Sequence, residues 1–177
     1  MSLNQDNTLF FIIDIQEKLL NAVFNKEQLE KKAKTLVKSA EILNIPVLVT
    51  EQYPQGLGDT IDGLKDFAKV FEKLAFSALA DSSLVEELKK INKNEIVIFG
   101  IETHICVYQT AIALLEAGYN VTLVKDASGS RSEIEHQTAI DCLKQCGVNI
   151  KTTEMILFEL LKGAKHHCFK QIQALIK

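Results

Sequence analysis

Short apolar runs alternate with amphipathic segments along this chain of 177 residues, and the alternation limits the folds that it can adopt. The apolar runs cover residues 8–14, 46–50, 70–71, 95–99, 120–124 and 149–152. Between the first two runs, Leu29, Leu36 and Leu43 recur at helical spacing, with Lys and Glu on the other face. Strands and helices in alternation predict βαβ units, and therefore a parallel sheet with right-handed crossovers.

Three pairs of residues have the spacing of a capping box, in which an N-cap side chain and a Glu or Gln three positions later each bond the other's backbone N–H. The pairs are Asn25 with Gln28, Ser83 with Glu86, and Ser132 with Glu135. We expect a helix to begin at each pair.

The composition fits a single domain over residues 1–177, because a chain of this length with 47% hydrophobic residues can bury a core. A net charge of −3 without a basic cluster argues against nucleic acid or an anionic membrane as a partner. The apolar runs are too short to span a bilayer, and residues 1–7 lack a signal-peptide pattern. Four cysteines in a chain this large and apolar do not indicate a disulfide framework. We therefore expect a reduced, cytoplasmic protein, with a trimmed organellar presequence as the alternative.

Cys106 lies where a predicted strand gives way to a predicted helix. The apolar run 95–99 is followed by a glycine, and Thr103 can cap the nearly all-apolar segment 105–117. The thiol would thus lie in the first helical turn, where the partial positive charge of the helix N-terminus lowers the pKa of a cysteine. Unpaired backbone N–H groups in such a turn can also bind an oxyanion. The alternative is a buried structural cysteine, the usual state of a free one.

Two further reactive side chains also stand at the ends of predicted strands. Asp14 ends the run 8–14, and Lys73 follows the run 70–71. An acid at the end of an apolar strand is unusual, because burying an unpaired carboxylate is costly. Ligands bind at the carboxyl ends of the strands in open α/β sheets, so we expect Asp14, Lys73 and Cys106 at one site. Taken singly, Asp14 could instead cap the following helix, and Lys73 could be an ordinary solvated side chain.

The segments around these residues resemble those of the isochorismatase-like cysteine hydrolases. Asp14 stands in the sequence IDIQ, Lys73 in FEKLAFSA and Cys106 in GIETHICVYQTA, in the family's order. The loop TEQYPQGLG at 50–58 and the segment DASGSRS at 126–132 belong to the same pattern. The resemblance covers nearly the whole chain and is strongest to the small isochorismatase-domain proteins of unassigned substrate. It implies a three-layer α-β-α fold whose six-stranded parallel sheet has the order 3-2-1-4-5-6.

The resemblance also implies a role for each residue of the set. Cys106 would be the nucleophile that attacks a carbonyl carbon, and Asp14 the general base that takes the thiol proton. Lys73 would favour the ionised forms of both. The family has a non-proline cis peptide just before the nucleophile, here Ile101–Glu102, which would place the N–H of Glu102 beside that of Cys106 as an oxyanion hole. An ordinary tight turn between strand and helix is the alternative.

We expect no metal ion and no cofactor. Nicotinamidases of the same superfamily bind a catalytic metal through an Asp-x-His pair and a further His after the second strand. The corresponding region of this chain, 49–54, offers only Glu51 as a ligand, and no histidine precedes His104. The sequence His166-His167-Cys168 could suggest a metal clip, but we expect exposed polar residues there.

The other reactive residues are expected to have ordinary roles. His104, next to the nucleophile, would be a positioning or solvent-facing residue. Cys142 and Cys146 are four residues apart on one predicted helix face, which makes them poor disulfide partners, and we expect small core residues.

The leading functional hypothesis is a metal-independent cysteine hydrolase acting on a small carbonyl substrate, with an amide C–N bond as the expected target. Four residues in or next to the site segments would line a narrow, partly aromatic pocket, although each could equally be core or interface; they are Glu51, Tyr53, Phe76 and Tyr108. One alternative is a vinyl ether hydrolase of isochorismatase type, a reaction that needs a proton donor but no nucleophile. The other is a binding or scaffold protein that kept the fold without the activity.

We also expect a homo-oligomer, a dimer or larger, because proteins of this family commonly form closed assemblies. Apolar residues near the C-terminus would contribute to the interface if the sheet leaves them exposed. These residues are Phe158, Leu160, Leu161, Phe169 and Ile172. Their helical spacing also permits packing onto the sheet.

Overall fold

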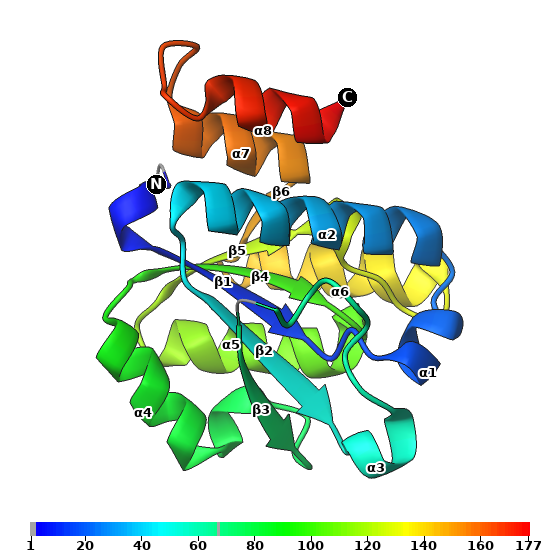
Figure 1. The fold of residues 1–177 in the computed structure, drawn as a ribbon. Helices are drawn as coiled ribbons and strands as arrows, with labels where there is room; N and C mark the ends of the chain where they lie inside the picture. The colour runs from blue at the N-terminus through cyan, green and yellow to red at the C-terminus, as the bar shows by residue number, and fades with distance from the viewer. Residues whose placement is uncertain (1–2, 67) are drawn as a thin grey trace.

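The predicted parallel sheet forms the centre of the computed structural model, which describes residues 3–66 and 68–177 (Figure 1). Six strands pair in the order β3-β2-β1-β4-β5-β6, and each strand pairs with its neighbours in parallel. The strands are β1 (Thr8–Ile13), β2 (Val47–Gln52), β3 (Lys69–Lys73), β4 (Glu95–Gly100), β5 (Asn120–Val124) and β6 (Asn149–Lys151). The fold class and strand order expected from the sequence are confirmed.

Helices connect the strands and cover the sheet on both faces (Figure 1). The α-helices are α1 (Glu17–Asn21), α2 (Lys26–Leu43), α3 (Pro54–Leu57), α4 (Ser82–Ile91), α5 (Tyr108–Glu116), α6 (Glu133–Gln145), α7 (Thr153–Leu161) and α8 (Phe169–Ile176). The shorter turns are η1 (Gln5–Asn7), η2 (Ala78–Ala80), the π-helical turn η3 (Thr103–Val107) and η4 (Lys125–Ala127).

The two helical layers enclose two separate apolar clusters. Helices α2, α7 and α8 contribute to the cluster on one face of the sheet, and α4, α5 and α6 to the cluster on the other. Strand β1 supplies both, since Phe10 and Ile12 join the first cluster while Leu9 and Phe11 join the second. A sheet covered on both faces explains why its strands appear in the sequence as continuous apolar runs rather than alternating ones.

The strand ends differ from the sequence prediction at positions that matter for the site. Strand β2 continues to Gln52, two residues beyond its predicted end, and β3 runs from Lys69 to Lys73 instead of covering 70–71. Strand β1 ends immediately before Asp14. The added residues are mostly polar, and hydrophobic periodicity does not detect polar residues within a strand.

Only one of the three predicted helix caps is made as expected. The Ser132 side chain accepts the N–H of Glu135 and begins α6. Helix α4 is capped by Asp81 instead of Ser83, because the Asp81 carboxylate accepts the backbone N–H groups of both Ser83 and Leu84. Asn25 precedes α2 without capping it, since its side-chain amide donates to the carbonyl of Ser128.

The C-terminal helices pack onto α2 more completely than the interface prediction assumed. Leu160, Leu161 and Ile172 are buried in the first apolar cluster, and Phe169 packs against it. Of the five apolar residues predicted to form a surface, Phe158 is the exposed one, at 44%. The prediction of an exposed apolar patch is therefore wrong, because most apolar residues of α7 and α8 pack into the cluster to which α2 also contributes. Among the described residues, no helix combines the length and apolar character needed to cross a bilayer.

Candidate active site

Asp14 lies at the carboxyl end of β1, at the centre of the sheet. Its φ of 53° is in the left-handed region, which Asp tolerates better than most residues. The carboxylate is fully buried, and each oxygen accepts a hydrogen bond: Oδ1 from the Thr50 hydroxyl at 2.8 Å, and Oδ2 from Lys73 Nζ at 2.7 Å. The Cys106 thiol lies near enough to this carboxylate for each group to shift the pKa of the other. The structure therefore brings the three expected residues together around Asp14.

Lys73 is the last residue of β3, and its side chain is only 3% exposed. Its ammonium group has three N–H donors and three acceptors within reach. These are Asp14 Oδ2 at 2.7 Å, Gln52 Oε1 at 2.6 Å and the carbonyl of Ala75 at 3.3 Å. A buried charge is tolerated when it is paired and hydrogen-bonded, as here.

Cys106 lies in the π-helical turn η3 and is buried. Burial and the neighbouring Asp14 carboxylate raise the pKa of the Cys106 thiol to about 12, and Lys73 acts in the opposite direction. The low pKa expected from a helix N-terminus is thus wrong, because removal from water and a nearby anion both disfavour the thiolate. Burial also raises the pKa of the Asp14 carboxyl, against the effects of Lys73 and Thr50. A raised pKa makes the Asp14 carboxylate a stronger base for the thiol proton.

Backbone hydrogen bonds and side-chain contacts join the turn that carries Cys106 to the segment 128–131. The Ile101–Glu102 peptide bond is cis, as the family resemblance implied. The backbone N–H of Thr103 donates to the carbonyl of Gly129, and Gly129 in turn donates to Gly100. Gly100 itself cannot be replaced without rearrangement, because a Cβ there would lie 2.0 Å from the carbonyl oxygen of Ile13.

Side-chain contacts also attach the turn that carries Cys106 to its surroundings. Arg131 Nε lies 2.7 Å from Glu102 Oε1, and His104 Nδ1 lies 2.9 Å from the hydroxyl oxygen of Ser130. His104 is half-buried, and its positioning or solvent-facing role stays a prediction. Thr103 does not cap the helix, since its hydroxyl is bonded to His136 Nδ1 at 2.9 Å and Glu102 occupies the N-cap position. Burial and the charge of Lys125 lower the pKa of His136 to about 4, so this histidine is neutral at pH 7.

We call Asp14, Lys73 and Cys106 the reactive set. Sequence reasoning missed two side chains that contact this set, Thr50 and Gln52. Both lie on β2 and are separated by one residue, so the two-residue period of a strand places them on one face. This two-residue period was the feature of the sequence that could have identified both side chains. The predicted end of β2 at residue 50 concealed it, because Gln52 then appeared to lie in a loop.

The four expected pocket residues have different environments. Glu51 is buried, and its carboxylate accepts the backbone N–H of Thr60 at 2.7 Å. Tyr108 is half-buried against the second apolar cluster, whereas Tyr53 and Phe76 are about half exposed, at 51% and 52%. Of the four, only Tyr53 lines the cavity that also includes Lys73. That cavity has a volume of about 470 Å³ and is lined by Tyr53, Pro54, Gln55, Glu72, Lys73, Leu74 and Asp81.

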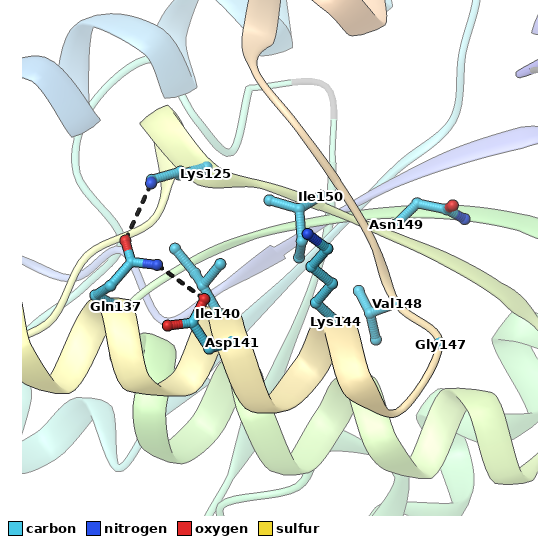
Figure 2. Close-up of a pocket in the computed structure, with 9 residues that line it drawn as sticks. All are labelled: Lys125, Gln137, Ile140, Asp141, Lys144, Gly147, Val148, Asn149 and Ile150. Carbon is cyan, nitrogen blue, oxygen red and sulfur yellow. Dashed lines mark hydrogen bonds between the residues drawn. The ribbon is translucent and has the colours of Figure 1, made fainter.

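A larger cavity of about 580 Å³ lies elsewhere, between α6 and β6 (Figure 2). Lys125 and Lys144 are its cationic residues, and Lys125 is bonded to Gln137, which in turn is bonded to Asp141 (Figure 2). None of the residues that line it belongs to the reactive set. The cavity beside Lys73 is therefore the better candidate for a substrate site.

One group of His, Cys or carboxylate side chains in the described part of the chain could hold a metal ion, namely His166, His167 and Cys168. Its candidate ligand atoms lie within 4.8 Å of one another. Cys168 is buried against α2, contrary to the exposed environment expected, and its backbone N–H donates to His166 Nδ1. That bond occupies one nitrogen of His166. Of the two other cysteines, Cys146 is exposed and Cys142 half-buried, so the expectation of core residues is wrong for Cys146.

A protein-family model described as Isochorismatase domain matches residues 8–155. Isochorismatase family protein 1A of Dictyostelium discoideum is 37% identical over 179 residues, which cover 97% of this chain and 86% of that protein. Isochorismatase domain-containing protein 1 of Salmo salar is 37% identical over 172 residues. That match covers 96% of this chain but 61% of the salmon protein, so the chain spans less than two thirds of that relative.

Solved structures show the same fold. The MAR1 ribonuclease from Caenorhabditis elegans matches with a TM-score of 0.94 and 36% identity, covering 99% of this chain and 92% of that chain. The YcaC gene product of Escherichia coli, described as an octameric hydrolase of unknown specificity, matches with a TM-score of 0.90. Its identity is 23%, with coverage of 99% and 95%, and at that identity the likeness concerns the fold alone.

Proposed function

Because the chain belongs to the isochorismatase family, we propose that it is a cysteine hydrolase in which Asp14, Lys73 and Cys106 act on a small carbonyl substrate. One observation carries the proposal. The buried Asp14 carboxylate accepts a hydrogen bond from the Lys73 ammonium and lies near the buried Cys106 thiol, so a candidate base, a cation and a candidate nucleophile lie together. The expected scissile bond is an amide C–N bond.

The reaction would begin with attack of Cys106 Sγ on the carbonyl carbon while Asp14 takes the thiol proton. The C–N bond then breaks, and the leaving nitrogen takes that proton from Asp14. A thioester to Cys106 remains. Water, deprotonated by Asp14, attacks the thioester carbon and releases a carboxylic acid, and the thiol regains its proton. Atoms and protons balance over the two steps.

Lys73 would stabilise the anionic states of this cycle. A cation beside Asp14 and Cys106 favours a thiolate as it forms, although burial disfavours it at rest. The backbone N–H groups of Glu102 and Cys106 are the proposed oxyanion hole, and the attachment of Glu102 to Arg131 would hold that turn in place.

The proposal includes no metal ion and no cofactor. In the described part of the chain, the side chains that hydrogen-bond to Asp14 and Lys73 are those of Thr50 and Gln52, neither of which is a strong metal ligand. The cavity of about 470 Å³ that Lys73 lines is the proposed site for a small-molecule substrate. The acidic side chains of Glu72 and Asp81 on its wall favour a neutral or cationic group there over an anionic one.

Three other functions differ from this one in the residues or the substrate that they need. A vinyl ether hydrolase would need Asp14 as proton donor but would not need Cys106, and a binding protein would need neither. RNA cleavage is a further candidate, because the Caenorhabditis elegans relative is named a ribonuclease. The net charge of −3 does not favour a polyanionic substrate.

A substrate screen distinguishes these functions. Purified protein would be incubated with a panel of small amides, a vinyl ether and single-stranded RNA, with Cys106→Ala as the matched variant. We expect an amide to be hydrolysed by the native chain and not by the variant. Activity that survives Cys106→Ala, or cleavage of RNA alone, would refute the proposal.

The assembly and location are also part of the proposal. We expect a homo-oligomer, as described for the octameric Escherichia coli protein of this fold. We also expect a cytoplasmic location, because all four cysteines are free thiols.

A further inference from the structure

Gln52 occupies the end of β2, directly beside Lys73 in the register of the sheet. Its side-chain oxygen accepts a hydrogen bond from Lys73 Nζ at 2.6 Å, and its side-chain nitrogen donates to the carbonyl of Leu74 at 2.8 Å. We propose that Gln52 is a positioning residue that holds the Lys73 ammonium against Asp14 and so makes Cys106 easier to ionise. The inference rests on the proposed function in one respect, that Cys106 is the nucleophile.

The two ends of the Gln52 amide are not interchangeable. Lys73 offers only N–H donors, so the atom that faces it must be the amide oxygen. The carbonyl of Leu74 is an acceptor, so the atom that faces it must be the amide nitrogen. A rotated amide would place N–H against N–H and carbonyl against carbonyl. The fixed orientation therefore keeps an acceptor against Lys73 Nζ and favours the position of Nζ beside Asp14.

Gln16 holds Gln52 in turn. The Gln16 side chain is fully buried, accepts the backbone N–H of Gln52 at 2.7 Å, and donates to the carbonyl of Gln52 at 3.0 Å. It also donates to the carbonyl of Gly58 at 2.6 Å. Gln16 thus pairs with the end of β2 much as a neighbouring strand would.

These contacts close a ring around the reactive set. Gln16 donates its backbone N–H to the carbonyl of Asp14 at 2.8 Å, and its side chain fixes Gln52. Gln52 fixes Lys73, and Lys73 is bonded to Asp14. The ends of β1, β2 and β3 are therefore joined by side-chain contacts as well as by the backbone pairing of the sheet. The charged groups that face Cys106 in this arrangement are Asp14 and Lys73.

The direction in which the rate of Cys106 alkylation changes when Gln52 is replaced distinguishes a positioning role from simple packing. If Gln52 only fills space, its replacement would loosen the site and make the buried thiol more accessible, so alkylation of Cys106 would become faster. If Gln52 positions the cation, its replacement would make the thiolate less favourable, so alkylation would become slower.

The experiment measures the rate at which iodoacetamide modifies Cys106, followed by mass spectrometry of the peptide that contains it, between pH 7 and pH 10. The variants are Gln52→Met, which has a similar shape but no hydrogen bonds, and Gln52→Glu, which adds an anion. The matched control is Gln171→Met on the exposed face of α8. Thermal unfolding of each variant shows whether it is folded.

We expect Gln52→Met to slow alkylation of Cys106 by about tenfold or more, the effect of leaving one buried donor without its acceptor. Gln52→Glu should also slow it, because a second anion near the thiol disfavours the thiolate. Gln171→Met should leave the rate unchanged. An unchanged or faster rate in folded Gln52→Met would overturn the proposal. If Gln52→Met does not fold, Gln52→Ala, which also lacks the hydrogen bonds and leaves more space, decides in the same way.

Alkylation needs no substrate, so this test can fail separately from the proposed function. If no amide is hydrolysed but the Gln52 variants react slowly, the hydrolase proposal fails and the positioning role stands. If Cys106→Ala abolishes turnover but the Gln52 variants react normally, the hydrolase proposal stands and the positioning role fails. Once a substrate is known, a positioning role should lower kcat more than it changes KM.

Discussion

Lys73 Nζ lies 2.7 Å from Asp14 Oδ2, and the two side chains are 3% and 0% exposed. The pair joins the end of an edge strand to the end of a central strand, since β2 lies between β3 and β1 in the sheet. An ion pair removed from water in this way costs more in desolvation than it returns unless its hydrogen bonds are complete. The hydrogen bonds to Thr50, Gln52 and Ala75 complete the pair here, so the buried charges are compensated.

The first prediction concerns removal of one partner of this pair. Lys73→Met should lower the free energy of unfolding by about 3–5 kcal/mol, because it leaves the Asp14 carboxylate buried without a cation. The double variant Asp14→Asn with Lys73→Met should recover part of that loss while remaining inactive. Urea unfolding measures the stabilities. A double variant as unstable as the sum of the single ones would show that the two side chains do not act as a pair.

The second prediction concerns Thr50, whose hydroxyl donates to Asp14 Oδ1. Thr50→Val keeps the shape and removes the donor, so we expect turnover to fall by about tenfold, with a stability loss of about 1–2 kcal/mol. Thr35→Val is the matched control, because Thr35 is also buried but donates to the carbonyl of Lys31 within α2. Its turnover should be unchanged. Equal turnover in the two variants would argue against a role for Thr50 in the site.

The third prediction concerns pH and His136. Burial lowers the pKa of His136 to about 4 from the ordinary value of 6.5, so the folded protein binds a proton there less readily than the unfolded chain. The stability contribution is therefore complete above pH 6.5 and is lost as the pH falls towards 4. We expect the free energy of unfolding to fall over that range in the native chain, by about 3 kcal/mol.

His136→Gln provides the comparison, since glutamine can still bond to the Thr103 hydroxyl but does not titrate. Its unfolding free energy should depend less on pH between 6.5 and 4. Urea denaturation at several pH values measures both proteins. Parallel pH curves would mean that another group causes the acid sensitivity.

The fourth prediction is metal independence, which follows from the hydrogen-bonding residues around Asp14 rather than from any feature of the C-terminal cluster. Dialysis against a chelator should leave hydrolysis unchanged, and elemental analysis should find no stoichiometric zinc or iron. Substitution of His166 by Gln, away from the proposed site, should likewise leave hydrolysis unchanged. Activity lost to the chelator and restored by added metal would contradict the prediction.

The fifth prediction is a mass in solution that is a multiple of 19.8 kDa. Large apolar side chains remain exposed in the monomer, among them Leu74 at 76%, Phe76 at 52% and Tyr53 at 51%, which follow β2 and β3. Such residues commonly mark an association surface. Light scattering at micromolar concentration measures the mass. A strictly monomeric value at that concentration would contradict the expectation of an oligomer.

The sequence by itself determined the parallel α/β class, its resemblance to a known family implied the strand order, and it placed three candidate reactive residues at one edge of the sheet. Buried parallel strands must be apolar throughout, so the central strands were visible as runs, and β5 was predicted with its observed bounds. Asp14, Lys73 and Cys106 were recognisable because each stands at or just after the end of such a run, where the edge of a parallel sheet gathers them.

Only the tertiary structure decided which side chains support those three and what burial does to them. Gln16 and Gln52 are 36 positions apart in the chain, and their contact depends on strand register, which apolar periodicity does not report. The direction of the Cys106 pKa shift depends on how much water is excluded and on the distance to Asp14, so a local helix-terminus argument gave the wrong sign. Burial of Leu160, Leu161 and Ile172 likewise depends on where α2 lies, since a helical apolar stripe is the same whether it meets the core or a second subunit.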